Sequence, residues 1–571
     1  MSEYLNMIEK EEDLLVDKVN GKNLMEYTRE IAKWVRVSGT KDEVESLEYC
    51  KKVLEGFGYK TNLTFHPGFI SVPLKAYVEM EYPKNISFEA LTHPFTPSTP
   101  PIGLTGEIVL STSPSIDGKI VLCDGLPSAD EVHNLERFGA IGAIYAQDDH
   151  LHNIALSKLW GGPTEDTESL IPAIPVVSIT RQSGNAIKEV IQNGRTRVRI
   201  ESIVYTDWVD IPLLEADIPS DKDDKFLLFT SHIDSWDYGA MDNGSANATL
   251  LECARLLAEK QPLWQRGLRL VFWAGHSQGK FFSSAWYADN HFEELEEKCI
   301  GHIYVDSTGG KDAVIIIEAP VMPQTKKLAA DVIKKQTGQD FIGKRIGHYA
   351  DQSFYGVGLT SIFGTFSEQD AQKNQDVVSF KMGNTKHAGG LGWWWHTKYD
   401  TIDKVDEEFL VRDTKIYLAV LWRLLTYPVL PYDFNEAAKE MAETVSNLQK
   451  KLKDRFDLSP LANRIDKLVA ATEELNKKAK SIKEPGREAE EINNILLKLS
   501  QKIVRVTFHG SNCFDFDLSG PMFPIPSLAD GERLANCPLG SHKYHSTKIK
   551  LQRGYNRVMH YVKEALELLQ Q

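Results

Sequence analysis

Apolar positions in the first part of the chain recur at helical spacing. The pattern includes Leu24, Ile31, Trp34 and Val35, and a second helical run extends from Val44 to Phe57. The segment GFGYKTNLTFH then opens with a glycine turn and continues with alternating polar and apolar residues. Because such alternation is typical of a half-buried strand, we expect residues 1–75 to supply helices and a strand to a larger domain.

The sequence pattern changes near residue 76. The stretch HPFTPSTPPIG is too rich in proline for a helix interior. It is followed by short apolar strands in GEIVLSTSPSIDGKIVLCDG, and then by two segments in which strand and helix patterns are adjacent. Residues 76–205 are therefore predicted to form a small α/β module of their own.

Residues 206–430 alternate buried strands with amphipathic helices. The strands are FLLFTSHID, LRLVFWAG and CIGHIYVDSTGG, and SANATLLECARLLAEKQ is a helix between the first two. This alternation predicts a mostly parallel sheet flanked by helices, which is an α/β fold. Residues 431–571 carry long, charged amphipathic runs such as EAAKEMAETVSNLQKKLKDRF and LANRIDKLVAATEELNKKAKSI, and they predict a helical domain.

The overall composition and net charge argue against some classes of binding partner. The chain has 571 residues, of which 42% are apolar and 25% charged, and its net charge is −15. This charge argues against nucleic acid or an anionic membrane as the main partner. Residues 1–16 lack the pattern of a signal peptide, and no apolar stretch approaches about 18 residues. With six cysteines and no CxxC pair, these features predict a cytoplasmic protein with buried free thiols.

Candidate ligands for a metal ion occur where predicted strands end. Ligands of parallel sheets bind at the carboxyl ends of the strands, and imidazoles gathered with carboxylates there suit a divalent ion. A carboxylate two residues after a ligand histidine can also orient its ring. The residues concerned are His232 and Asp234, Asp242, His276, Asp306 and His396.

These segments resemble the co-catalytic zinc exopeptidases, the family of glutamate carboxypeptidase, the double-zinc aminopeptidases and the transferrin receptor. The family pattern has H-x-D, D-N-G-S, a Glu-Glu pair, an Asp and H-T-x-x-D-T, and this chain has SHID, MDNGS, YVDS and HTKYDT in that order. The segment ADQSF at 350–354 is similar to another family segment, S-D-H-x-x-F. By the same resemblance, residues 76–205 are a protease-associated domain inserted in a catalytic domain of residues 1–75 and 206–430. Residues 431–571 are a dimerisation-like helical domain.

The resemblance also implies the roles of individual residues. His232, Asp242 and Asp306 would hold one metal ion, with Asp242 bridging to a second ion that His396 also binds. Asp234 would orient His232, and the family often has a cis peptide at the position of Asp242–Asn243.

The chain departs from the family at the Glu-Glu pair. His276 stands where the family has its general base, and Ser277 stands where it has a ligand of the second metal. His276 could act as a base, because an imidazole titrates near neutrality, or it could be a ligand. Since the site loses a carboxylate, we expect one firmly bound metal ion, zinc in the first place, with a second ion weak or absent. Trp394 and Trp395 are candidates for a substrate-binding wall, with core packing as an equal alternative.

Three functions remain open at this stage. The first is a metal-dependent hydrolase of a peptide or small amide C–N bond, with His276 as proton shuttle. The second is a one-metal enzyme of another kind, a lyase, a cyclase or a non-haem iron enzyme, since two histidines and a carboxylate also suit iron. The third is a non-catalytic binding protein like the transferrin receptor. The expected partners are a small peptide or amide substrate and a second copy of the chain in a homodimer, without nucleic acid or membrane.

Overall fold

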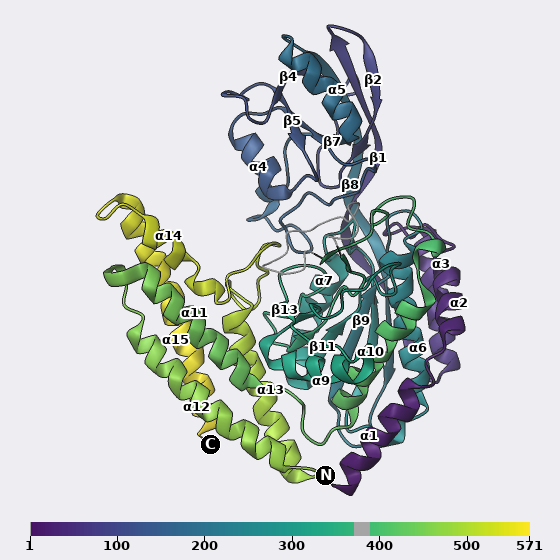
Figure 1. The fold of residues 1–571 in the computed structure, drawn as a ribbon, viewed down its shortest axis with the longest axis vertical. Helices are drawn as coiled ribbons and strands as arrows, with labels where there is room; N and C mark the ends of the chain where they lie inside the picture. The colour runs from purple at the N-terminus through teal and green to yellow at the C-terminus, as the bar shows by residue number, and fades with distance from the viewer. Residues whose placement is uncertain (1, 371–388, 571) are drawn as a thin grey trace.

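The computed structural model describes residues 2–370 and 389–570 (Figure 1). Helices form the N-terminal segment, flank the sheet and make up most of the C-terminal region. The α-helices are α1 (Glu3–Val16), α2 (Gly21–Ile31), α3 (Lys41–Gly56), α4 (Ala129–Arg137), α5 (Arg181–Gln192), α6 (Ala246–Ala258), α7 (Phe282–Asn290), α8 (Phe292–Lys298), α9 (Lys326–Thr337), α10 (Glu407–Thr426), α11 (Phe434–Leu452), α12 (Ser459–Ser481), α13 (Arg487–Thr507), α14 (Asp530–Asn536) and α15 (His542–Leu569).

Two strands are unusually long, and most of the others are short. The strands are β1 (Lys60–Tyr82), β2 (Ile86–Glu89), β3 (Leu91–Thr92), β4 (Leu104–Leu110), β5 (Ile120–Asp124), β6 (Gly142–Ala146), β7 (Val176–Ile179), β8 (Arg197–Ile218), β9 (Phe226–His232), β10 (Gly267–Trp273), β11 (Cys299–Tyr304), β12 (Pro320–Val321), β13 (Lys344–Arg345), β14 (Ser361–Ile362), β15 (Gln369–Asp370) and β16 (Gly389–Gly390). All but β15 and β16 belong to one mixed sheet of fourteen strands.

The centre of the sheet is parallel and buried on both faces. Strands β14, β11, β9 and β10 are neighbours in that order, and each adjacent pair runs parallel. Successive side chains of a strand point to opposite faces. Accordingly, Phe229 and Phe272 pack into the cluster that contains α6 and α10, whereas Leu228 and Trp273 face Tyr287 of α7. The predicted α/β fold with a parallel sheet between helices is confirmed.

The N-terminal helices pack on the first of these faces. Leu15 of α1, together with Leu47 and Leu54 of α3, belongs to the same apolar cluster as Phe229. The buried carboxylate of Glu12 also pairs with Arg423 of α10, with oxygen–nitrogen distances of 2.7 and 2.9 Å. These contacts attach residues 3–56 to the domain that contains β9, β10 and β11.

Strands β1 and β8 join this domain to the smaller α/β module at the top of Figure 1. They pair antiparallel from Lys60–Asp217 to Tyr82–Arg197. At one end β8 pairs with β10, and at the other it pairs with β4, from which the sheet continues through β5, β6 and β7. The module has apolar clusters of its own. The sequence pattern predicts domain boundaries at residues 75–76 and 205–206. Nevertheless, β1 runs without a break through the first boundary and β8 through the second.

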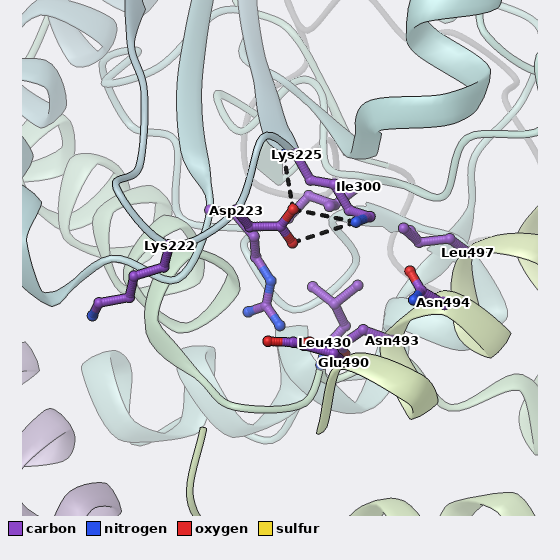
Figure 2. A pocket seen from close by; sticks show the side chains of 10 residues that line it. Lys222, Asp223, Lys225, Ile300, Leu430, Glu490, Asn493, Asn494 and Leu497 are labelled. Carbon is purple, nitrogen blue, oxygen red and sulfur yellow. Dashed lines mark hydrogen bonds and ion pairs between the residues drawn. The ribbon is translucent and has the colours of Figure 1, made fainter. Parts of the chain in front are cut away.

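The C-terminal helices lie beside the sheet domain and leave a cavity of about 150 Å³ against it (Figure 2). The cavity is lined by residues at the starts of strands, including Lys225, Arg266 and Ile300, and by Glu490 and Asn494 of α13. Because it lies at the amino ends of β9, β10 and β11, it is far from the edge where the candidate ligands gather.

The structure also shows the apolar length of the helices and the state of the cysteines. Within residues 2–370 and 389–570, no helix is both long enough and apolar enough to cross a lipid bilayer. All six cysteines are free, and all except Cys513 are buried.

Candidate metal centre

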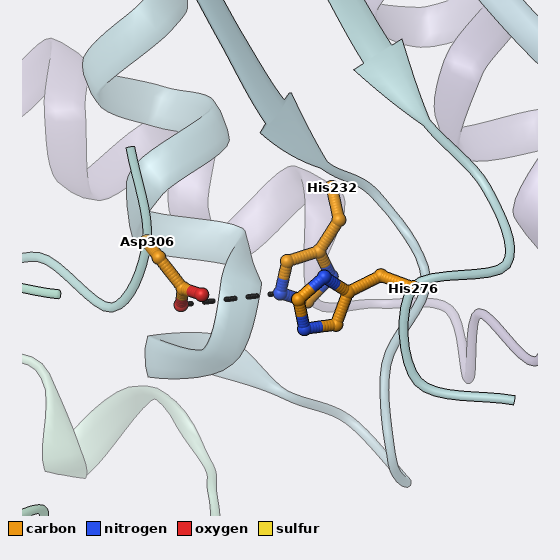
Figure 3. A group of neighbouring side chains, drawn as sticks. All are labelled: His232, His276 and Asp306. Carbon is orange, nitrogen blue, oxygen red and sulfur yellow. Dashed lines mark ion pairs between the residues drawn. The ribbon is translucent and has the colours of Figure 1, made fainter. Parts of the chain in front are cut away.

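Three parallel strands bring the first candidate ligands to one edge of the sheet. His232 is the last residue of β9, His276 follows β10 by three residues, and Asp306 follows β11 by two. Since β9 lies between β10 and β11, the three side chains converge (Figure 3). One nitrogen or oxygen atom from each lies within 4.8 Å of the others, a spacing that fits a metal ion.

The ring of His232 is fixed so that one nitrogen faces this cluster. Its Nδ1 is 2.9 Å from the backbone oxygen of Asp234, and the Asp234 carboxylate lies farther away, at 3.7 Å. Its Nε2 is buried and forms no hydrogen bond within the described part of the chain. This nitrogen lies 3.1 Å from Asp242 Oδ1 and 3.9 Å from Asp306 Oδ1. A buried ring nitrogen without a hydrogen bond, facing two carboxylates, is suited to a cation.

Asp242 lies between two histidines. Its Oδ1 faces His232 Nε2 at 3.1 Å, and its Oδ2 faces His396 Nε2 at 3.2 Å. The peptide bond between Asp242 and Asn243 is cis. Asp400 accepts hydrogen bonds from the backbone N–H groups of Met241 and Asp242, both at 2.9 Å. One carboxylate oxygen for each histidine is the arrangement that a bridging ligand needs.

Asp306 is oriented by two hydroxyl groups. Tyr304 donates to its Oδ2 and Ser307 to its Oδ1, both at 2.9 Å. The backbone N–H of Ser307 in turn donates to Asn243 Oδ1 at 2.8 Å, so the loops that carry Asp306 and Asp242 are tied together.

The pKa shifts of the clustered residues indicate an excess of buried negative charge, which favours binding of a cation. Burial, together with the nearby Asp242 carboxylate, raises the pKa of Asp306 above its usual range. Burial would also raise the pKa of Asp242, but His232 and His396 outweigh it and hold that pKa well below its usual range. Burial lowers the pKa of His232, yet three surrounding aspartates raise it well above its ordinary value. A divalent ion at His232, Asp242 and Asp306 would neutralise these carboxylates directly.

His276 lies over His232 but is held by different groups. Its Nδ1 is 2.7 Å from Asp351 Oδ2, and because a carboxylate only accepts, this nitrogen carries the proton. Its backbone N–H and that of Ser277 donate to the two oxygens of Asp234, at 3.0 and 2.7 Å. The Asp234 carboxylate therefore holds the loop after β10, while its carbonyl orients His232.

The stacking of the two rings bears on whether His276 is a ligand. The ring centroids of His232 and His276 are 3.8 Å apart, and their planes differ by only 6° (Figure 3). An imidazole binds a metal along its own ring plane. When two rings are stacked and parallel, an ion in the plane of one ring lies outside the plane of the other. Since His232 Nε2 faces the carboxylates of Asp242 and Asp306, the geometry favours His232 as the ligand and leaves His276 beside the ion position.

His396 approaches the cluster from a separate loop. It has a positive φ of 58°, and its Nδ1 is 2.6 Å from the backbone oxygen of Asn153. Burial lowers the pKa of His396, and Asp242 partly offsets the shift. The adjacent Trp394 and Trp395 are only 3% and 9% exposed and pack in an apolar cluster with Met241, which corresponds to the packing alternative.

Sequence reasoning did not find several residues that complete the site. The motif ADQSF contains Asp351, but nothing in it relates this residue to His276, which is 75 positions away. Asn153 belongs to the smaller module, and nothing in its local sequence relates it to His396. Arg36 lies in the loop between α2 and α3, and its only local signal is that a charged residue stands between Val35 and Val37.

Arg36 is wholly buried and supports the loop between His232 and Asp242. Its Nε donates to the backbone oxygen of Ile233 at 2.7 Å, and its Nη atoms donate to those of Tyr238 and Gly239, both at 2.9 Å. It also caps the carbonyls of Ile31 and Trp34. One guanidinium therefore satisfies five backbone carbonyls and fixes the span that separates two candidate ligands.

We expect the substitution Arg36→Met to destabilise the protein by at least about 3 kcal/mol, because it leaves buried carbonyls without donors. Arg36→Lys should recover part of the loss. Urea-induced unfolding measures both, with Arg487→Met as control, since the Arg487 side chain is 91% exposed. Equal stability of Arg36→Met and the control would show that the five hydrogen bonds do not hold the loop.

Comparison with known proteins agrees with the expected resemblance. Residues 214–421 match the family described as peptidase family M28, and residues 96–187 match the PA domain. Probable glutamate carboxypeptidase VP8 of Zea mays is 25% identical over 274 residues, 46% of this chain but only 37% of the maize protein. Probable glutamate carboxypeptidase AMP1 of Arabidopsis thaliana is 20% identical over 561 residues, which cover 82% of this chain and 77% of that protein.

Solved structures share the fold. The peptidase M28 precursor from Shewanella amazonensis superposes with a TM-score of 0.59 at 18% identity, covering 74% of this chain and 98% of its own. The aminopeptidase from Aneurinibacillus sp. strain AM-1 superposes with a TM-score of 0.55 at 19% identity, covering 72% and 96%. The predicted resemblance to the zinc exopeptidases is confirmed for the fold and for the two matched regions.

Proposed function

Because residues 214–421 are a domain of peptidase family M28 and residues 96–187 a PA domain, we propose that this chain is a metal-dependent hydrolase of peptide or small amide C–N bonds. The observation that carries the proposal is the convergence of His232 Nε2, which has no hydrogen bond in the described chain, on the carboxylates of Asp242 and Asp306. A receptor without a need for metal would have little reason to keep these buried charges together.

The tighter metal site consists of His232, Asp242 and Asp306. A divalent ion held there, zinc in the first place, would supply Lewis-acid activation of water and of the scissile carbonyl. A second ion would have only Asp242 and His396, because Ser277 stands in place of a carboxylate ligand. The second ion is therefore weak or absent in this proposal.

His276 serves as the proton shuttle. Asp351 fixes the proton on its Nδ1, at 2.7 Å, and leaves Nε2 to exchange a proton with the reacting groups. His276 takes a proton from the attacking water and returns it to the leaving nitrogen. The Asp351 carboxylate stabilises the imidazolium formed between these two steps, in the way that a buried aspartate supports a catalytic histidine.

The substrate, compartment and assembly complete the proposal. The names of the plant relatives, probable glutamate carboxypeptidases, support a peptide substrate. We place the activity in the cytoplasm on small peptides or amides, and we expect a homodimer formed by the helical region 431–571. We retain residues 76–205 as the inserted module and residues 1–75 and 206–430 as the catalytic domain, with β1 and β8 continuous across the two boundaries.

One observation favours a second candidate. Because Ser277 offers no carboxylate, the centre has the ligands of a one-metal enzyme, and a lyase, a cyclase or a non-haem iron enzyme could use them. This candidate predicts a single iron or zinc ion and no cleavage of amide bonds. A binding protein like the transferrin receptor would contain no tightly bound metal.

Metal content and turnover together test the proposal. Protein purified without added metal is expected to carry about one zinc ion per chain, as counted by mass spectrometry, and to cleave members of a dipeptide and amide panel. Removal of the ion with a chelator should abolish cleavage, and added zinc should restore it. One iron without amide cleavage would favour the second candidate, and a chain without metal would overturn both.

A further inference from the structure

The PA-domain residues 152–161 reach into the candidate centre. Asn153 meets His396 three times: its carbonyl lies 2.6 Å from His396 Nδ1, and its backbone N–H and side-chain Nδ2 donate to the His396 carbonyl at 3.1 and 3.4 Å. His152 Nδ1 lies 2.6 Å from the carbonyl of Trp395. The loop that presents His396 is therefore anchored on the PA domain at two consecutive residues.

The same segment reaches His276 through a chain of side chains. Trp160 Nε1 donates to Ser353 Oγ at 2.7 Å, and Ser353 Oγ is 2.7 Å from Ser284 Oγ. Ser284 donates to Asp351 Oδ1 at 2.7 Å, and the other oxygen of Asp351 holds His276 Nδ1. Unbroken hydrogen bonds thus lead from the PA domain to the imidazole proposed as proton shuttle.

Close packing keeps this segment in place. Gly161 donates its N–H to the carbonyl of Lys280 at 2.7 Å, and its φ is +67°. A Cβ at Gly161 would lie only 2.7 Å from the Cβ of Ala285, so a larger residue would not fit there. The Trp160 ring also packs on Phe281, with centroids 4.7 Å apart.

We infer that residues 152–161 of the PA domain position both imidazoles of the centre, His396 through Asn153 and His276 through Trp160. In each ring the contact is made at Nδ1, the nitrogen away from the reacting groups, so it fixes which nitrogen carries the proton. Asn153 and Trp160 are thus positioning residues, and the catalytic unit includes the PA domain. The inference rests on the proposed function for its catalytic meaning, but the orientation of the rings can be observed without turnover.

Two pairs of variants separate the two contacts. Trp160→Phe keeps the ring but removes the donor to Ser353, and Trp208→Phe is its control because Trp208 is 51% exposed. His152→Leu removes the donor to the Trp395 carbonyl, and His152→Asn restores a donor nitrogen close to the position of Nδ1. Thermal unfolding of all four variants shows which of them remain folded.

Nuclear magnetic resonance of protein labelled with ¹⁵N-histidine reports the protonated nitrogen of each ring. In the parent we expect His276 and His396 to be protonated at Nδ1. Trp160→Phe should mix the two tautomers of His276 alone. His152→Leu should do so for His396 alone, and His152→Asn should restore the parent spectrum. Unchanged spectra of both rings in Trp160→Phe and His152→Leu would overturn the inference.

Kinetics then link the orientation to catalysis. Trp160→Phe should lower kcat about tenfold, the lower end of the usual effect of outer groups on a metal site, while KM stays within about twofold. Parent-like kcat in this variant would also overturn the inference. If the chain has no hydrolase activity, the proposed function fails while the spectra still decide the inference.

Discussion

Replacement of His276 by alanine is expected to abolish turnover while leaving the tightly bound metal ion in place. Loss of a general acid–base group costs about 10²–10⁴-fold in rate, so kcat should fall into that range or below detection. The metal should remain because an ion can lie in the plane of only one of the two stacked, parallel rings, and His232 is the one whose Nε2 faces Asp242 and Asp306. Steady-state kinetics and metal counting on the same preparation measure the two effects.

Matched variants make this result specific. Asp351→Asn should also lower kcat strongly, because an amide can donate a hydrogen bond to Nδ1 and stabilise the wrong tautomer. His560→Ala is the control, since the His560 side chain is 64% exposed. If His276→Ala loses its metal together with its activity, His276 is a ligand and the argument from stacking is wrong.

Restoring a carboxylate at position 277 is expected to create a second strong metal site. In Ser277→Glu the new side chain would join Asp242 and His396, which already face each other at 3.2 Å. The added charge should raise affinity for the second ion at least about 100-fold, because a divalent ion needs both a further ligand and charge balance. Calorimetric titration of metal-free protein with zinc should change from one strong event to two.

The control for charge is Ser277→Gln, which has nearly the same shape without the carboxylate. It should retain a single strong event. Two strong events in the parent protein, or a crystal structure with two full ions and Ser277 coordinating one of them, would refute the reasoning from the missing glutamate pair.

Most of the centre could be predicted because its residues follow strands. His232, His276 and Asp306 are placed by the rule that parallel strands end at one edge, and that rule needs only the alternation of strands and helices. Motif resemblance predicts Asp242 and His396, and in the structure Asp242 lies beside His232 while His396 faces the other oxygen of Asp242. Local pattern and motif order are sufficient for residues whose position is set by regular elements.

The rest depended on contacts that no local pattern encodes. The hydrogen bond from Asp351 to His276 joins loops 75 positions apart, and Asn153 lies 243 positions from His396. Arg36 acts on backbone carbonyls, which every residue carries, so the sequence around its partners contains no trace of it. The stacking of His276 on His232 likewise follows from the loop after β10 being held by Asp234, a detail of tertiary structure.

The pairing of β1 with β8 has a consequence for how the inserted α/β module could be lost in evolution. Since Tyr82 faces Arg197 at the end of the ladder, everything between them occupies the place of a hairpin loop. Excision of the intervening residues would leave two strand ends that a short turn could close, so recombination could remove the module without disturbing the sheet below. The shortened chain would retain every candidate metal ligand but lose Asn153 and Trp160. Loss of the module, although topologically simple, would therefore change the orientation of His276 and His396.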